Sequence, residues 1–166
     1  MTDDETTTRS GRTTTGALVA TVHRAWAADL DARTLYELLR LRTDVFVVEQ
    51  NSAYSELDGR DLEDRARHYW LGGPGGREQV LGCLRLLKEP GGEYHIGRLC
   101  TAPSARGRGL GVRLLEAALG EVGDGTCVLD SQEHLAELYR RYGFVPTGPA
   151  YDWDGVAHLP MRRVRR

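Results

Sequence analysis

Residues 104–119 read SARGRGLGVRLLEAAL and place a glycine-rich, basic loop directly before a helical pattern. The first turn of a helix leaves its N–H groups without partners inside the helix, and the aligned peptide dipoles concentrate about half a positive charge there. Glycine has no Cβ atom, so an anion can approach the backbone closely. Arg106 and Arg108 add two positive charges. The stretch therefore predicts a site for an anionic ligand such as a diphosphate.

Other interpretations of this loop fit the residues less well. The loop lacks the GxxxxGK(S/T) frame of a Walker P-loop, and the GxGxxG dinucleotide frame fails because position 112 is valine. An RNA-binding arm would need repeats with interleaved aromatic residues, which this sequence does not have. A flexible turn that enters a helix without a ligand stays open as the alternative.

The segments around this stretch alternate between extended and helical patterns. β-branched and aromatic residues predict strands, and apolar residues at helical spacing predict helices. The expected strands are residues 17–25, 68–73, 79–87, 94–100, 126–130, 145–151 and 156–164, and the expected helices are residues 31–46, 109–122 and 133–144. Residues 45–50, VFVVEQ, fit either a helix or a strand. The order predicts an α/β fold with one mixed, largely antiparallel sheet flanked by helices.

Local signals mark where several of these elements begin and end. Asp31 is placed to cap the free amides of the first helix. Gly143 follows the last helix as a stop signal, and Asp154-Gly155 predicts a hairpin turn between the final two strands. The central helix is expected to bury one stripe, formed by Val112, Leu115, Leu119 and Val122.

Composition limits the domain count and the partners. The 166 residues are the length of one ordinary domain. Residues 1–15 hold seven threonines and no large apolar residue beyond Met1, which predicts a disordered tail before a domain spanning residues 16–166. A net charge of −2 argues against a binder of nucleic acid or of a membrane surface. No apolar run approaches the roughly 18 residues of a membrane span, so we expect a cytoplasmic protein.

The cysteines do not indicate a disulfide framework. Cys83, Cys100 and Cys127 are odd in number and far apart, so neither paired disulfides nor a CxxC metal site fits them. They are expected to be reduced, and no metal is predicted. The sequence leaves the oligomeric state open, a homodimer included.

The loop and its surroundings resemble the GNAT acetyltransferase superfamily. The family's signature is Gln or Arg, two residues of any type, Gly, one residue of any type, and Gly or Ala. It stands here as residues 106–111, RGRGLG, directly after LCTAPSA, which resembles the end of the family's fourth strand. Two pairs of stretches are similar to the ElaA branch: LLRLRTDVFVVEQ with YSELDGRDLEDRARH, and SQEHLAELYRRYGF with YDWDGVAHLPMRR. The resemblance covers about residues 20–163. It departs at Ser131, where the branch is expected to have alanine, and in the threonine-rich tail.

The resemblance implies that acetyl-CoA or another acyl-CoA is the cosubstrate. Its pyrophosphate would lie mostly on backbone amides of the signature, Arg106, Gly107, Arg108, Gly109, Leu110 and Gly111. Strand 94–100 would splay from strand 126–130, and the pantetheine arm would add to its unpaired edge along Leu99, Cys100 and Thr101. Plain core packing of Leu99 and Cys100 stays open as the alternative.

The resemblance also implies direct transfer of the acyl group to a primary amine, which makes the protein an N-acetyltransferase. Tyr139 in LYRRYGF matches the family's helix tyrosine, and its phenol would protonate the leaving thiolate. Tyr139 also fits the apolar stripe of its helix, so a core aromatic stays open. Glu49 closes an apolar run, and we expect it to be a base that acts through water, with a pKa raised by partial desolvation.

Four other polar residues have a structural interpretation beside a catalytic one. His68 and His158 have the intrinsic pKa of a base, but a histidine in a strand is often structural. Gln132 and His134 follow strand 126–130 and are expected to cap the next helix.

Residues 55–70 carry five acids against three arginines. In the family this segment usually covers the acceptor site, so a cationic small-molecule or peptide amine is expected to bind there. The alternative is a solvated charged loop in which the arginines pair locally. The second function that stays open is a catalytically silent acyl-CoA-binding or interaction module.

Overall fold

One eight-stranded sheet runs through residues 19–72 and 79–164, which are the residues that this computed structural model describes. The strands are β1 (Thr21–Trp26), β2 (Ala66–Gly72), β3 (Val80–Lys88), β4 (Tyr94–Thr101), β5 (Cys127–Gln132), β6 (Val145–Pro146), β7 (Tyr151–Trp153) and β8 (Val156–Arg163). The helices are α1 (Ala32–Arg42), its π-helical continuation η2 (Thr43–Glu49), α2 (Leu110–Val122) and α3 (Ala136–Arg141). The predicted α/β fold with one mixed, largely antiparallel sheet is confirmed. The predicted tail, residues 1–15, lies outside the described residues.

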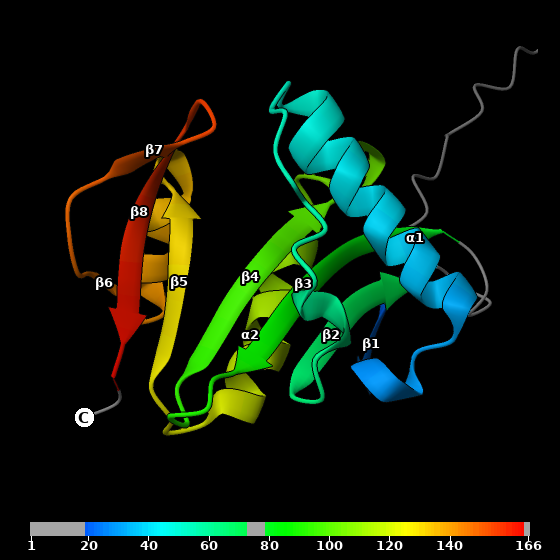
Figure 1. Cartoon of the computed structure of the whole chain (residues 1–166), viewed down its shortest axis with the longest axis horizontal. Coiled ribbons are helices and arrows are strands. Elements are labelled where there is room, and N and C mark those ends of the chain that lie inside the picture. Colours follow the sequence, from blue (N-terminus) through cyan, green and yellow to red (C-terminus); the bar gives the residue numbers. More distant parts are fainter. Residues whose placement is uncertain (1–18, 73–78, 165–166) are drawn as a thin grey trace, which may run out of the picture.

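The sheet is narrowly joined at its centre. The strand order is β1-β2-β3-β4-β5-β8-β6, with β7 paired to β8, and the β4–β5 pair is parallel. That pair holds together at two positions, Tyr94↔Cys127 and His95↔Val128. Beyond them the two strands diverge into a V (Figure 1). The sheet therefore has two halves with a gap between them, and the β4 edge that faces the gap is unpaired after His95.

Helices cover both faces of the first half of the sheet. Helix α1 crosses the near face and α2 the far face (Figure 1), and β3 between them is buried along its length except for Lys88. Leu38 of α1 and Leu114 of α2 are at most 1% exposed. Within the predicted stripe of α2, Leu115, Leu119 and Val122 are buried, whereas Val112 is half-buried and lines the cavity described below.

The predicted boundary signals act as expected. The Asp31 carboxylate accepts a hydrogen bond from the backbone N–H of Thr34 at 2.9 Å and so caps α1. Gly143 follows α3 with a φ of +86°, and Asp154 and Gly155 form the β7–β8 turn with φ values of +50° and +84°. All of these signals depend on neighbours within a few positions.

Of residues 45–50, which the sequence left undecided, 45–49 are helical and Gln50 caps the helix. Thr43–Glu49 continues α1 in the wider π geometry, which is often found at functional sites. Val45 is buried and Phe46 packs against the core, so tertiary contacts hold this β-prone segment in a helix.

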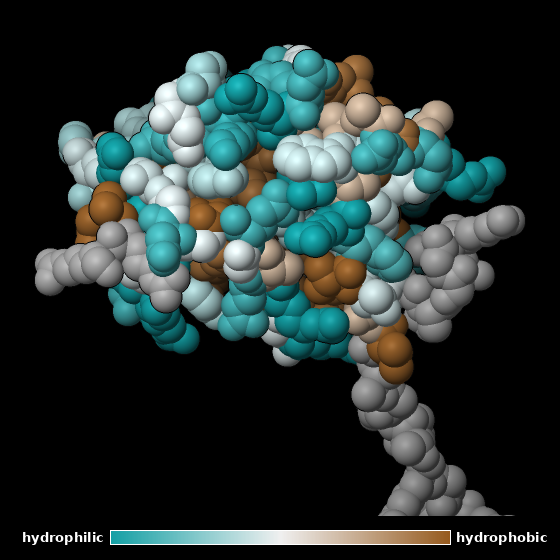
Figure 2. All heavy atoms as spheres, turned by 90° about the horizontal axis from the view of Figure 1, so that it is seen from below, coloured by the Kyte–Doolittle hydropathy of each residue, from teal (hydrophilic) through white to brown (hydrophobic). Residues whose placement is uncertain are grey.

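The surface view from below shows apolar side chains in separate patches among hydrophilic ones (Figure 2). Within the described residues, none of the helices has the length and apolar character to cross a membrane. Cys83, Cys100 and Cys127 are free and buried.

Candidate active site

A cavity of about 710 Å³ opens where β4 and β5 separate. Its walls come from η2, β4, the loop before α2, β5, α3 and β8. The predicted site residues among its lining are Glu49, Leu99, Cys100, Thr101, Arg106, Gly107, Gly109, Leu110, Gly111 and Tyr139. Arg108 is exposed and does not line the cavity. The gap in the sheet thus brings together residues that the sequence assigned to one ligand and its chemistry.

The glycine loop presents free backbone amides to this cavity. Gly107 and Gly109 have φ values of +71° and +69°, a region that residues with a Cβ atom rarely adopt. Arg113 donates its N–H to the carbonyl of Gly109, so the amides from Gly109 to Val112 precede the first intrahelical bond. A Cβ atom built at Gly107 or Gly109 would meet no atom within 4 Å. The loop is therefore an open, positively polarised surface that fits a diphosphate.

Strand β4 carries a bulge beside the cavity. Leu84 of β3 lies opposite two residues of β4, Arg98 and Leu99, because the register passes from Cys83↔Cys100 to Arg85↔Gly97. Arg98 has a φ of +57°, which is uncommon for a residue with a side chain. The bulge removes backbone groups from the regular ladder at the point where the β4 edge faces the gap.

Glu49 and Arg106 form an ion pair from opposite walls of the cavity. Arg106 donates to both carboxylate oxygens of Glu49, at 2.6 and 2.7 Å. This hydrogen bonding holds the pKa of Glu49 below its ordinary value, and 42% of the Glu49 side chain is exposed. The expectation of a desolvated Glu49 with a raised pKa is wrong, because a guanidinium 57 positions away in the sequence stabilises the carboxylate.

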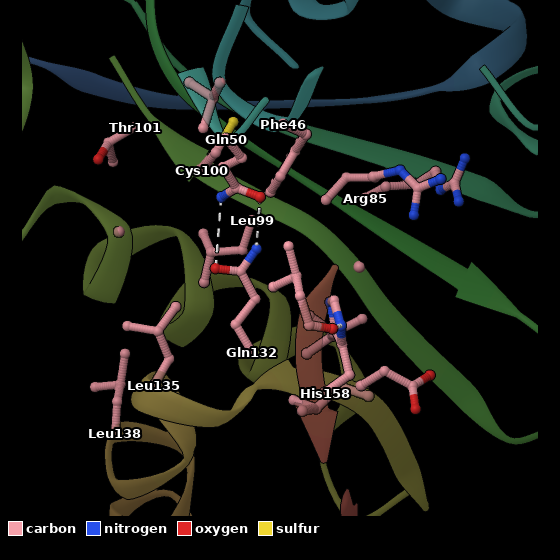
Figure 3. Close-up of a pocket in the computed structure, with 18 of the residues that line it drawn as sticks. Phe46, Gln50, Arg85, Leu99, Cys100, Thr101, Gln132, Leu135, Leu138 and His158 are labelled. Carbon is pink, nitrogen blue, oxygen red and sulfur yellow. Dashed lines mark hydrogen bonds between the residues drawn. The ribbon is translucent and has the colours of Figure 1, made fainter. Parts of the chain in front are cut away.

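Gln50 and Gln132 meet between the two halves of the sheet. Their amides exchange two hydrogen bonds, at 3.0 and 3.5 Å, and Figure 3 shows them beside Leu99. Gln132 therefore does not cap the following helix, where no side-chain cap is formed. His134 lies in a short 3-10 turn and lines the cavity. The capping expectation fails because the Gln132 amide has a partner across the gap.

Tyr139 combines the catalytic and the core positions that the sequence left open. It lines the cavity, is 6% exposed and packs edge-on against Phe144 at 5.9 Å. Burial raises the pKa of Tyr139 to about 12. None of the described residues hydrogen-bonds to its hydroxyl. At neutral pH the group is therefore a protonated phenol whose O–H is available to a ligand.

The acidic segment 55–70 is largely neutralised by arginines. Arg42, 2% exposed, binds Glu56 and Asp61 at 2.5 Å each, and Arg85 binds Asp58 at 2.7 Å. Burial alone would raise the pKa of Asp61, but the hydrogen bonds and charges of Arg42 and Arg85 together hold it below its ordinary value. These carboxylates are paired rather than free, so the expectation that they bind a cationic amine is not supported.

His68 has a structural role. It is buried, and because a carbonyl oxygen only accepts, its Nε2 donates to the backbone oxygen of Asp61 at 2.8 Å. Burial lowers the pKa of His68. In contrast, His158 lines the cavity. The described residues contain no cluster of His, Cys, Asp and Glu side chains arranged to hold a metal ion.

Comparison with known proteins agrees with this geometry. The family profile described as Acetyltransferase (GNAT) domain matches residues 47–165. The chain belongs to the GNAT acetyltransferase family. A UPF0039 protein of Mycobacterium tuberculosis is 54% identical over 145 residues, which cover 86% of this chain and 92% of that protein. The predicted likeness to ElaA is confirmed, since Escherichia coli ElaA is 36% identical over 145 residues, covering 82% of this chain and 91% of ElaA.

Solved GNAT-family structures match the whole described fold. An acyl-CoA N-acyltransferase from Pseudomonas aeruginosa superposes with a TM-score of 0.81 at 40% identity, covering 88% of this chain and all of that one. The crystal structure of Escherichia coli ElaA superposes with a TM-score of 0.79 at 32% identity, covering 87% and 99%. This GNAT chain thus has the fold of acyltransferases that use a CoA thioester.

The structure adds residues to the GNAT site that the sequence analysis did not single out. Gln50 follows Glu49 directly, within the stretch that resembles ElaA, so its position gave a signal. The sequence carried no signal for Arg98, because the residue type does not reveal that the backbone of an arginine has a positive φ. The Arg98 guanidinium binds Glu56 and Asp58 and lines the cavity beside Arg85.

Proposed function

We propose that this protein transfers an acetyl group from acetyl-CoA to a primary amine. The observation that carries the proposal is the cavity that starts at the glycine loop and follows the unpaired edge of β4. A diphosphate fits the free amides from Gly109 to Val112, and an extended arm with its own amide groups fits the free edge at Leu99–Thr101. Both belong to CoA.

The β4 bulge supports a role for backbone amides in the reaction. Acyl transfer builds negative charge on the thioester oxygen, and donors that are already oriented stabilise that charge most effectively. The bulge at Arg98 and Leu99 lies between the pantetheine edge and the charge network, where backbone groups leave the ladder. We assign the polarisation of the thioester carbonyl to this bulge.

Tyr139 is the proposed acid. Its phenol is protonated at neutral pH, since its pKa is about 12, and its hydroxyl has no partner among the described residues. Proton donation to the departing thiolate would prevent the thiolate from re-attacking the product. The transferred proton would be replaced from the acceptor nitrogen as the amide forms.

The test measures binding and chemistry separately. Calorimetry with CoA and acetyl-CoA reports binding, and a thiol-reactive dye reports CoA release over a panel of primary alkylamines, polyamines, amino acids and lysine peptides. Tertiary amines of matched size are the control, because they have no proton to lose and form no stable amide. We expect binding of CoA and release with at least one primary amine. Binding without release would favour the silent acyl-CoA-binding module.

A further inference from the structure

His158 lies on β8 beside the gap in the sheet. Its register partner is Gln132, the last residue of β5, whose side chain reaches Gln50 across the cavity. Figure 3 shows His158 near Gln132 among the lining side chains. The imidazole therefore belongs to the wall opposite the free edge of β4, where the pantetheine arm is proposed to lie.

The backbone fixes which nitrogen of His158 carries the proton. Nδ1 lies 2.8 Å from the carbonyl oxygen of Val156, and a carbonyl oxygen only accepts, so Nδ1 is the donor. The neutral ring then keeps its lone pair on Nε2. None of the described residues hydrogen-bonds to Nε2. His158 is thus held in one orientation with an unoccupied basic nitrogen.

Aromatic rings and a small number of titratable groups surround this imidazole. Tyr151 of β7 stacks on it with ring centres 6.0 Å apart, and Trp153 lies 5.5 Å away. Asp130, two positions before Gln132 on β5, lies on the same face of the sheet. On the opposite wall, His95 of β4 lies 3.8 Å from Asp130.

Three other titratable side chains in or near the cavity are less suited to accept a proton. Glu49 is held by Arg106, which lowers its pKa, and Asp58 is bound by Arg85 and Arg98. His95 lies at the closed end of the V, where β4 and β5 still pair, and burial lowers its pKa.

We propose that Nε2 of His158 accepts the proton that the acceptor ammonium must lose before it can attack. This inference rests on the proposed function. The ammonium gives one proton to Nε2, and the freed lone pair forms the N–C bond as the C–S bond breaks. The thiolate takes a proton from Tyr139, which regains one from the new amide nitrogen. His158 then releases its proton to solvent, so one proton leaves for each amine acylated.

The experiment compares the parent protein with His158→Gln, His95→Gln and His23→Gln, using the best amine of the panel. His23 stacks on Trp70 at the far edge of the sheet and serves as the control. In the parent, kcat/KM should fall as the pH is lowered, because Nε2 can accept a proton only while it is unprotonated. His158→Gln should lower kcat by about 10² to 10⁴ and lose this acid limb, with the affinity for acetyl-CoA unchanged. The acid limb should persist in the other two variants.

Three results would overturn the assignment while the parent is active. The first is that His158→Gln turns over within about threefold of the parent. The second is that the acid limb disappears in His95→Gln instead. The third is that ¹⁵N chemical shifts show the Nε2–H tautomer of His158 at pH 8. The NMR measurement uses the parent protein, so it decides the tautomer even if His158→Gln does not fold. A parent that binds acetyl-CoA but acylates no amine would instead overturn the proposed function, and this inference with it.

Discussion

At the residue scale, Gly109 combines a left-handed backbone conformation with a position on the wall of the cavity. Its φ of +69° costs a residue with a Cβ atom roughly 1–2 kcal/mol, and the Cβ atom would point into the open space of the loop. We expect Gly109→Val to weaken CoA binding by more than about tenfold, or 1.4 kcal/mol, while the fold is kept. Calorimetry gives the affinity, and a thermal melt reports the fold.

Gly92→Val is the matched control for this substitution. Gly92 has a φ of +87° and equally open surroundings, but it lies in the β3–β4 turn and does not line the cavity. The two variants share the backbone strain, so a difference in CoA affinity isolates the ligand contact. Equal affinity in Gly109→Val and the parent would mean that the diphosphate binds elsewhere.

Tyr139→Phe tests the role of a single oxygen atom. The ring and its contact with Phe144 remain, and the lost hydroxyl has no hydrogen bond to break in the described structure. If the phenol is the acid, kcat should fall by about 10² to 10⁴ while CoA affinity and melting temperature stay close to those of the parent. Steady-state turnover and a melt of both proteins make the measurement.

Tyr142→Phe is the matched control for Tyr139→Phe. Tyr142 follows α3 directly, and its hydroxyl donates to Glu116 outside the cavity. Loss of the Tyr142 hydroxyl should leave turnover within a few-fold of that of the parent. If Tyr139→Phe behaved in the same way, a water molecule or the acceptor's own proton would have to serve the thiolate.

At the element scale, the charge network joins α1 to segment 55–70 and to β3. Asp61 and His68 have pKa values below their ordinary ones in the folded state, so unfolding takes up protons as the pH falls. The His68 contribution to stability is complete above about pH 6.5 and is lost below it, and that of Asp61 is complete above about pH 4 and is lost below that. We expect the melting temperature to fall in these two windows.

Asp61→Asn should destabilise the fold by about 3–5 kcal/mol at pH 7, because it leaves Arg42 buried with one partner fewer. The variant should also lose the part of the acid dependence below pH 4. Asp64→Asn, at an exposed position in the same segment, is the control. A melting temperature unchanged in Asp61→Asn would show that the network contributes little.

At the scale of the whole molecule, two half-sheets meet at two residue pairs of β4 and β5. A ligand that contacts the glycine loop and the free β4 edge would fill the gap between them. Acetyl-CoA at 100 times its Kd should stabilise the protein by about 2.7 kcal/mol, which corresponds to roughly 5–10 °C in melting temperature. Hydrogen exchange should slow at Leu99–Thr101 in the complex, and unchanged exchange there would contradict the pantetheine position.

The sequence by itself determined the features that depend on near neighbours. The Asp31 cap, the turn at Asp154-Gly155 and the glycine loop at residues 106–111 use residues that lie within a few positions of one another. Hydrophobic periodicity gave the order of strands and helices for the same reason. These local patterns, together with the resemblance that they carry, were sufficient for the fold.

Only the tertiary structure decided the features that depend on remote partners. The lowered pKa of Glu49 is caused by Arg106, 57 positions away in the sequence. Gln132 hydrogen-bonds to Gln50, 82 positions away, and does not cap a helix. The role of the acids in segment 55–70 could not be read from the sequence, because their ion pairs with Arg42 form only in the folded chain. Burial, charge pairing and the tautomer of a histidine are set by atoms that meet in space, and chain folding alone brings those atoms together.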